Sequence, residues 1–76
     1  MTAFPTVPAR DIIRYLKKQG FVLLRQKGSH KFFRHPDGRT ATVPDHKGED
    51  IGKGLMLKIL KDIEVSQQEF LDWYAG

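Results

Sequence analysis

Two predicted strands separated by a Gly-Ser pair constrain the fold of this chain more than any other feature. Residues 21–27 and 30–35 are both rich in the β-branched and aromatic side chains that suit a pleated strand. Gly28 lies between them and can adopt backbone angles of a tight turn that strain other residues. The pattern therefore predicts an antiparallel hairpin, in which Ser29 leaves the turn and His30 is the first residue of the second strand.

A third strand is predicted at residues 39–43, after a turn that contains Pro36, Asp37 and Gly38. Proline presets one backbone angle of such a turn and glycine supplies another. Pro44 then ends the strand. Three strands joined by short turns form an antiparallel meander. Because so small a meander is not stable alone, helices must cover one of its faces.

Apolar residues at helical spacing flank these strands on both sides. They recur at i, i+3, i+4 and i+7, which places them on one face of an α-helix. The first stripe is Ala9, Ile12, Ile13 and Leu16, and the second is Met56, Ile59, Leu60 and Ile63. We expect Gly20 to end the first helix and Asp50 to cap the start of the second. The predicted fold is α+β: helix, three-stranded antiparallel sheet, helix.

A short C-terminal helix is predicted after Ser66. Ser66 and Glu69 have the spacing of a capping box, in which each side chain accepts a hydrogen bond from the backbone of the other residue. This helix carries several large apolar side chains, among them Trp73 and Tyr74. They either complete the core or face a partner, and the sequence leaves both interpretations open.

Length and composition limit the remaining possibilities. A chain of 76 residues buries only about 60% of its unfolded surface, so we predict one domain over residues 1–76. Residues 1–7 show no periodicity and are expected to form an N-terminal arm.

The lack of cysteine excludes disulfide scaffolds and thiolate zinc sites. No apolar run approaches the length of a membrane span and no signal peptide is recognisable, so we expect a soluble cytoplasmic protein.

His30 is the first candidate for catalysis. An unperturbed imidazole has a pKa of about 6.5 and exchanges protons near neutral pH. Five basic residues lie near it in the sequence: Arg25, Lys27, Lys31, Arg34 and Arg39. The net charge of +4 fits a polyanionic partner, although it fits a merely soluble basic surface equally well. A proton-transfer group within a cationic surface suggests chemistry on a phosphate backbone.

The other histidines are assigned different roles. An odd offset along a strand places His35 on the opposite face from His30, where it supports the following turn. His46 lies in a polar loop and is interpreted as solvated, although it could move toward a substrate. Because no carboxylate stands at ligand spacing from these histidines, we predict no metal site.

Two further residues have alternative interpretations. Ser29 could bond the backbone of its own turn or contact a phosphate, and the turn is preferred. Lys53 stands beside Gly52 and Gly54, which leave backbone N–H groups accessible at a helix start. Such an end is either an anion site or a frayed helix start with a solvated lysine.

Several motifs, taken in order, resemble the HicA toxin family of toxin–antitoxin systems. They are Gly20-Phe21, Gln26-Lys27-Gly28-Ser29-His30, Arg34-His35-Pro36-Asp37-Gly38 and Val43-Pro44. The resemblance covers roughly residues 9–71 and implies a double-stranded-RNA-binding-like fold. It implies a small endoribonuclease that cleaves mRNA and arrests translation, with His30 as the catalytic histidine. It also implies a HicB antitoxin that covers the His30 surface. Glu64 departs from the family pattern, since many relatives have glycine there.

The resemblance and the basic residues together define an expected RNA-binding set. Its members are Arg25, Lys27, Gly28, Ser29, Lys31, Arg34 and Lys53. We expect no cofactor, no membrane association and no direct binding of DNA by this chain. The alternative is a non-catalytic module that binds double-stranded RNA with the same fold.

Overall fold

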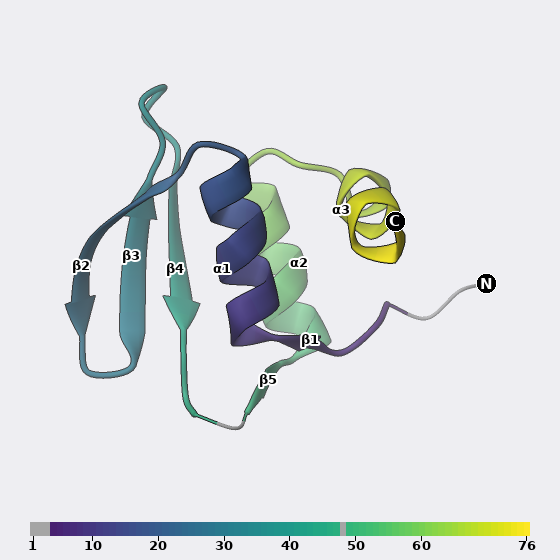
Figure 1. Ribbon diagram of the computed structural model, residues 1–76, viewed down its shortest axis with the longest axis horizontal. Helices are drawn as coiled ribbons and strands as arrows, with labels where there is room; N and C mark the ends of the chain where they lie inside the picture. Colours follow the sequence, from purple (N-terminus) through teal and green to yellow (C-terminus); the bar gives the residue numbers. More distant parts are fainter. Residues whose placement is uncertain (1–3, 48) are drawn as a thin grey trace.

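The computed structural model describes residues 4–47 and 49–76. Its elements are β1 (Val7–Pro8), α1 (Ala9–Lys18), β2 (Val22–Lys27), β3 (His30–Arg34), β4 (Thr40–Pro44), β5 (Asp50–Ile51), α2 (Lys53–Asp62) and α3 (Gln67–Ala75). Strands β2, β3 and β4 form an antiparallel sheet in that order, and α1 and α2 both lie next to β4, with α1 in front of α2 in this view (Figure 1). The predicted α+β order of helix, three-stranded sheet and helix is confirmed.

The hairpin between β2 and β3 has the predicted turn. Lys27 and His30 are paired, so Gly28 and Ser29 form a two-residue loop. Gly28 has a φ of 58°, whereas Ser29 does not have a positive φ. A positive φ at the first central residue alone characterises a type II′ turn, in which glycine is preferred at that position. The sequence position of this glycine therefore sets where β3 begins.

Helix α1 ends where Gly20 was predicted to end it. Gly20 has a φ of 99°, and its N–H donates to the carbonyl of Lys17 at 3.1 Å. The N–H of Phe21 donates to the carbonyl of Leu16 at 2.9 Å. These two bonds form a Schellman motif, which satisfies carbonyl groups at the helix end and leads the chain directly into the sheet.

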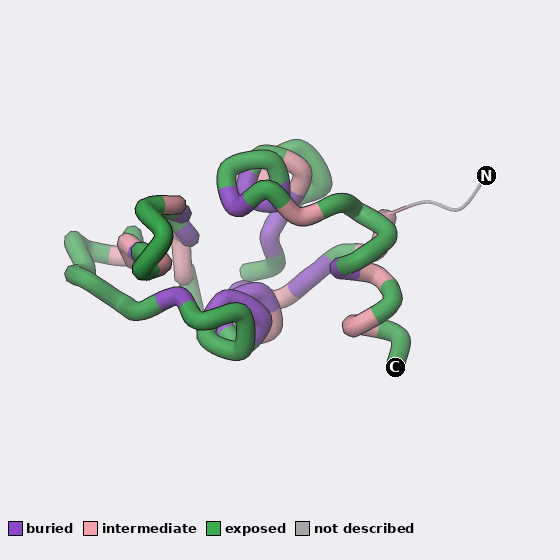
Figure 2. Tube along the Cα trace, turned by 90° about the horizontal axis from the view of Figure 1, so that it is seen from above, coloured by how far each residue is buried: buried purple, intermediate pink, exposed green. Residues whose placement is uncertain are grey.

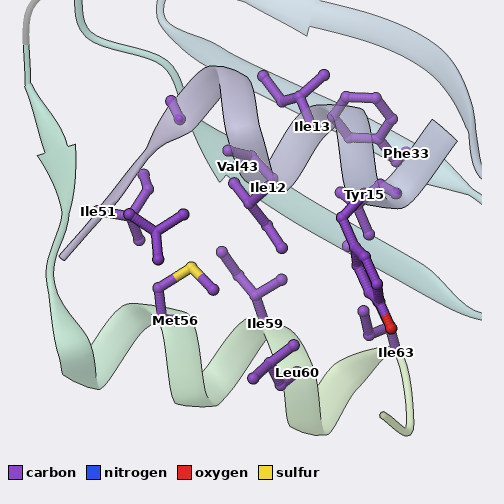
Figure 3. Packing of buried hydrophobic residues seen from close by; sticks show 14 of the residues in the cluster. Ile12, Ile13, Tyr15, Phe33, Val43, Ile51, Met56, Ile59, Leu60 and Ile63 are labelled. Atoms are coloured by element: carbon purple, nitrogen blue, oxygen red, sulfur yellow. The ribbon is translucent and has the colours of Figure 1, made fainter. Parts of the chain in front are cut away.

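The core lies between α1, α2 and one face of the sheet. In Figure 3, Ile12 of α1, Ile59 of α2 and Val43 of β4 point toward one another. All eight residues of the two predicted stripes are buried. Phe33 and Val43 are also buried, whereas β2 is exposed along its whole length (Figure 2). The sheet therefore has one covered face and one face that is largely open to solvent.

The prediction of an N-terminal arm is wrong for the described residues that precede α1. Val7 is fully buried and pairs with Ile51 in the two-stranded β1–β5 ladder. The ring of Phe4 stacks on that of Phe70 with centroids 6.0 Å apart. Residues 1–3, which also belonged to the predicted arm, lie outside the described residues. A ladder of two residues is too short to produce a sequence period, so only its tertiary partner reveals it.

The same ladder corrects the predicted start of α2. Asp50 pairs with Pro8 in the ladder instead of capping the helix. Gly52 occupies the N-cap position, with no side-chain cap hydrogen bond. The helix thus begins later than the sequence indicated.

Helix α3 begins with the predicted capping box, formed by Ser66 and Glu69. Its aromatic residues pack against α1. The ring of Trp73 lies 4.9 Å from that of Tyr15, and the hydroxyl of Tyr74 donates to Asp11 at 2.7 Å. This hydrogen bond to a carboxylate is the main cause that raises the pKa of Tyr74 above its ordinary value. The structure therefore favours the interpretation that Trp73 and Tyr74 complete the core.

Glu64, the departure from the family pattern, has a left-handed backbone with a φ of 59°. Its N–H donates to the carbonyl of Lys61 and the N–H of Val65 to that of Leu60, which repeats the Schellman motif at the end of α2. We expect Glu64→Gly to raise the free energy of unfolding by about 1 kcal/mol, since glycine adopts this conformation without a Cβ clash. Glu64→Ala keeps the Cβ and should change stability little. Urea denaturation of the three proteins measures both effects, and a Glu64→Gly protein no more stable than Glu64→Ala would contradict the expectation.

Candidate active site

His30 lies on the open face of the sheet. Alternation along β3 places Phe33 in the core and His30, Phe32 and Arg34 on the opposite side. The side chains of the paired residues Thr42 and Pro44 of β4 lie on this side as well. We call this surface the open face. It presents His30, an exposed residue, at the end of a strand whose other face is anchored in the core.

A β-bulge at Leu24 brings two cations onto the open face. Leu23 pairs with Phe33, but Arg25 pairs with Phe32, so the register shifts by one residue between them. Without this shift, Arg25 would project toward the covered face. With it, the guanidinium of Arg25 lies 4.8 Å from the centroid of the Phe32 ring. Lys27, two residues further on, stands directly opposite His30.

Lys31 lies on the covered side of the sheet, unlike the other cations of the hairpin. It pairs with the buried Val43, and its ammonium group forms an ion pair with Asp45 at 2.7 Å. The side chains of Lys31 and Asp45 are only 25% and 30% exposed. The expectation that Lys31 joins the cations around His30 is therefore wrong, because successive strand residues point to opposite faces.

The loop after β4 brings a second histidine to the hairpin turn. The N–H of Asp45 donates to the carbonyl of Ser29 at 2.6 Å. The next residue, His46, has its Nε2 atom 3.2 Å from Oγ of Ser29. The centroids of the His30 and His46 rings are 6.4 Å apart. The Ser29 hydroxyl therefore contacts the loop, whereas the sequence favoured a bond to the backbone of its own turn. His46 is exposed, as predicted, but lies against the hairpin.

His35 is held by backbone groups and faces away from His30. Its Nδ1 accepts the N–H of Asp37 at 3.1 Å, and its Nε2 lies 3.0 Å from the carbonyl of Gln19. The backbone N–H of Arg39 is the main cause that lowers the pKa of Asp37 in the same turn. These contacts agree with the predicted supporting role of His35.

A groove of about 400 Å³ runs between the open face and α2 beside His30. It is lined by His30, Thr42 and Pro44 from the sheet, and by Leu55, Lys58, Ile59 and Asp62 from α2. Lys58 was missed by sequence reasoning and forms an ion pair with Asp62 at 2.9 Å. The spacing of the four α2 residues is again i, i+3, i+4 and i+7. This second helical stripe, which lies beside the buried one, could have indicated a functional face.

The remaining predicted cations, Arg34, Lys53 and Arg39, do not lie next to His30. Arg34 is on the open face four residues along β3 from His30, or about 13 Å at roughly 3.3 Å per residue. Lys53 is the exposed first residue of α2 and is not among the residues that line the groove. Arg39 packs over the ring of Phe21 and donates to the carbonyl of Ile63, so it supports the fold.

Comparison with known proteins identifies the family. The family model of the HicA toxin of bacterial toxin–antitoxin systems matches residues 9–65. The chain belongs to the HicA toxin family. It is also 38% identical over 50 residues to a probable mRNA interferase HicA of Pseudomonas fluorescens (strain Pf0-1). That alignment covers 66% of this chain and 82% of the relative.

The HicA match contains every element that contributes a residue to the candidate site. It begins at α1 and ends just after α2, so it includes the hairpin, the loop with His46 and the groove. The β1 strand and α3 lie outside it. The structure of this chain thus has the double-stranded-RNA-binding-like fold expected for HicA proteins, with two small additions that pack against it.

Proposed function

We propose that this HicA protein is the endoribonuclease toxin of a toxin–antitoxin pair and that it cleaves mRNA with His30 as a proton-transfer group. The observation that carries the proposal is the exposed position of His30 on the open face, opposite Lys27 and next to the groove. An imidazole held between phosphate-binding cations can act on the atoms of a bound phosphodiester. The relative named as a probable mRNA interferase supports the choice of substrate.

The proposed reaction uses the 2′-hydroxyl of the RNA as its nucleophile. A base removes the proton of this hydroxyl while its oxygen forms a bond to phosphorus. The bond between phosphorus and the 5′-oxygen then breaks, and an acid protonates the departing oxygen. The products are a 2′,3′-cyclic phosphate and a 5′-hydroxyl. His30 supplies one of these two proton transfers, and positive charge stabilises the phosphorane-like transition state.

Binding of the RNA is proposed to depend mainly on its backbone. Arg25, Lys27 and Arg34 are the cations of the open face, and cations of this kind contact phosphates without reading base sequence. Phe32 lies between them under the guanidinium of Arg25. The Phe32 ring is half-buried, and guanidinium planes as well as aromatic rings stack with unpaired bases, so the Arg25–Phe32 pair is suited to contact one. We therefore infer that the open face accepts a single-stranded segment of mRNA.

The cellular setting follows from the substrate and the family. A toxin that cleaves mRNA must act where translation takes place, so we propose that it works in the cytoplasm, under the control of a HicB-type antitoxin. No helix in the described part of the chain is long and apolar enough to cross a membrane.

The proposal is tested by the substrate and ion requirements of cleavage. We expect the purified protein to cleave an RNA oligomer in excess EDTA, because the reaction needs only the 2′-hydroxyl and groups of the protein. The fragments should carry a cyclic phosphate and a 5′-hydroxyl end, and a DNA oligomer of the same sequence should stay intact.

Two outcomes would contradict this account. If EDTA stops cleavage and Mg²⁺ or Mn²⁺ restores it, the reaction depends on a metal ion. If the protein binds RNA tightly but leaves it intact under all conditions, the chain is the non-catalytic binding module instead. End-labelling of the fragments and a gel-shift assay with the same oligomer distinguish these cases.

A further inference from the structure

We propose that His46 is the second proton-transfer group of the reaction and forms an acid–base pair with His30. The inference rests on the proposed function, since it assigns the proton transfer that His30 leaves unfilled. Two observations support the inference: the centroids of the two exposed rings are 6.4 Å apart, and His46 contacts Ser29.

The loop that carries His46 is tied to the hairpin through Asp45, the residue before it. The N–H of Asp45 donates to the carbonyl of Ser29 at 2.6 Å, and the carboxylate of Asp45 binds Lys31 at 2.7 Å. On the other side of the histidine, the N–H of Glu49 donates to the carbonyl of His46 at 3.0 Å. The two Asp45 contacts therefore hold the backbone just before His46 close to the start of β3, and the Glu49 bond closes a turn within the loop.

Ser29 orients the ring of His46. Its hydroxyl is 3.2 Å from Nε2 and can donate to a neutral imidazole or accept from a protonated one. A hydroxyl suits both protonation states, so the contact is compatible with a ring that gains and loses a proton during each cycle. Ser29 precedes His30 directly, and one short segment thereby positions both imidazoles. Ser29 is a positioning residue in this arrangement.

The two rings are close enough to reach different oxygens of one phosphate. In an in-line displacement the attacking 2′-oxygen and the departing 5′-oxygen lie on opposite sides of phosphorus. The base and the acid must therefore flank the phosphate and not contact each other. Each reaches its oxygen through a hydrogen bond of about 2.8 Å. Rings with centroids 6.4 Å apart are too close to admit a phosphate between them, but both can contact one phosphate that lies beside the pair, each through its own hydrogen bond.

The charged surroundings of His46 are of mixed sign. The groups that line its side of the molecule are Arg10 of α1, Asp45, Lys47 and Glu49 of the loop, and Asp50 of β5. His30 and Ser29 face it from the hairpin. Asp45 is already paired with Lys31, so it is not a dedicated partner for the imidazolium form. When RNA binds, the negative charge of its phosphate is then the main charge added near both rings.

In the proposed step, one imidazole accepts the proton of the 2′-hydroxyl as the bond from oxygen to phosphorus forms. The other imidazole, protonated at the start, donates its proton to the 5′-oxygen as that bond to phosphorus breaks. Each ring finishes in the opposite protonation state, and exchange with water restores both. The step consumes no co-reactant and produces only the two RNA fragments.

The test measures single-turnover cleavage against pH for the wild-type protein, His46→Ala and His46→Gln. We expect the wild-type profile to be bell-shaped, with one limb for each group. Both variants should cleave about 10²- to 10⁴-fold more slowly and lose one limb. Lys61→Gln, a change at an exposed position of α2 that does not line the groove, is the control and should retain the rate and both limbs. Ser29→Ala should be slower but keep both limbs, as expected for a positioning residue.

A modified substrate identifies the acid. An RNA with sulfur in place of the scissile 5′-oxygen has a thiolate leaving group, which departs without a proton because thiols have pKa values near 8.5. This substrate should restore the rate in either His30→Ala or His46→Ala, whichever lacks the acid, and in only one of them. Restoration in neither variant would overturn the acid–base pair.

The experiments give different results if His46 is not the second group and if the protein is not a ribonuclease. If His30→Ala is inactive but a folded His46 variant keeps the wild-type rate and both limbs, His46 is not the second group and the ribonuclease assignment stands. A His46 variant that is slower but keeps both limbs would also overturn the proposal, since His46 would then act only through structure. If the wild-type protein cleaves no RNA, the proposed function itself is wrong. Circular dichroism and RNA binding of each variant show whether it is folded.

Discussion

Replacing His30 with alanine is expected to lower the rate of RNA cleavage by about 10²- to 10⁴-fold, the usual contribution of one positioned proton-transfer group. The stability of the protein should change by less than about 0.5 kcal/mol, as for most surface substitutions. His30 is exposed, and its ring makes no hydrogen bond to another of the residues that the structure describes. The variant should bind RNA nearly as well as the wild-type protein, since the cations of the open face remain.

The measurement combines single-turnover cleavage with thermal unfolding and with growth after induced expression. His35→Ala is an informative control, because the two histidines have opposite surroundings. His35 bonds the backbone at Gln19 and Asp37, so its loss should destabilise the fold by about 1 kcal/mol for each hydrogen bond. Cleavage by the folded fraction should continue. A folded His30→Ala protein that cleaves at the wild-type rate would show that the chemistry lies elsewhere.

The antitoxin is expected to abolish RNA binding by covering the same surface. The open face offers cations at Arg25, Lys27 and Arg34, and we expect carboxylates of the antitoxin to face them. Next to these cations, β2 exposes the apolar side chain of Val22, which pairs with Arg34 and is 58% exposed, and Leu24 at the bulge is 61% exposed. Such residues provide the apolar contact that a stable complex needs. Lys31 was expected to take part, but its ion pair with Asp45 removes it from this surface.

Competition on the inactive His30→Ala protein measures this directly. Labelled RNA should be displaced completely by the antitoxin, and association of the two proteins should slow as salt screens their charges. Reversal of charge at Arg25 and Lys27 should weaken the complex, whereas Lys18→Glu at the exposed end of α1 should not. A ternary complex that contains RNA and antitoxin together would mean that the inhibitor binds elsewhere.

Much of the fold was predictable because it depends on neighbouring residues. The apolar stripes of α1 and α2, the turn at Gly28 and the capping box at Ser66 involve interactions within a few positions of the chain. Gly20 is enough to end α1, since few other residues adopt a φ of 99° without strain. The position of His30 at the start of β3 follows from the same hairpin turn. Local preferences and local hydrogen bonds determine these features, and the sequence displays them.

Strand alternation explains why Lys31 departs from its predicted place. The alternation that separates His35 from His30 also separates Lys31 from it, although Lys31 was grouped with the cations around His30. The bulge at Leu24 is different, because it reverses the alternation for Arg25 and Lys27. Nothing in the apolar run of β2 indicates where the extra residue lies. The pairing with β3 decides it, and with it the charge of the open face.

The sequence by itself determined α1, the body of α2, α3, the three-stranded sheet with its hairpin and the position of His30 at the start of β3. Only the tertiary structure brought His46 within reach of His30, joined Val7 to Ile51 and placed Lys58 beside the groove. Ser29 and His46 are 17 positions apart, and β3, β4 and the ion pair between Lys31 and Asp45 set the distance between them. Contacts of this kind depend on how separate elements pack, which leaves no period or spacing in the chain. The sequence therefore predicts one half of the candidate acid–base pair, and the fold supplies the other.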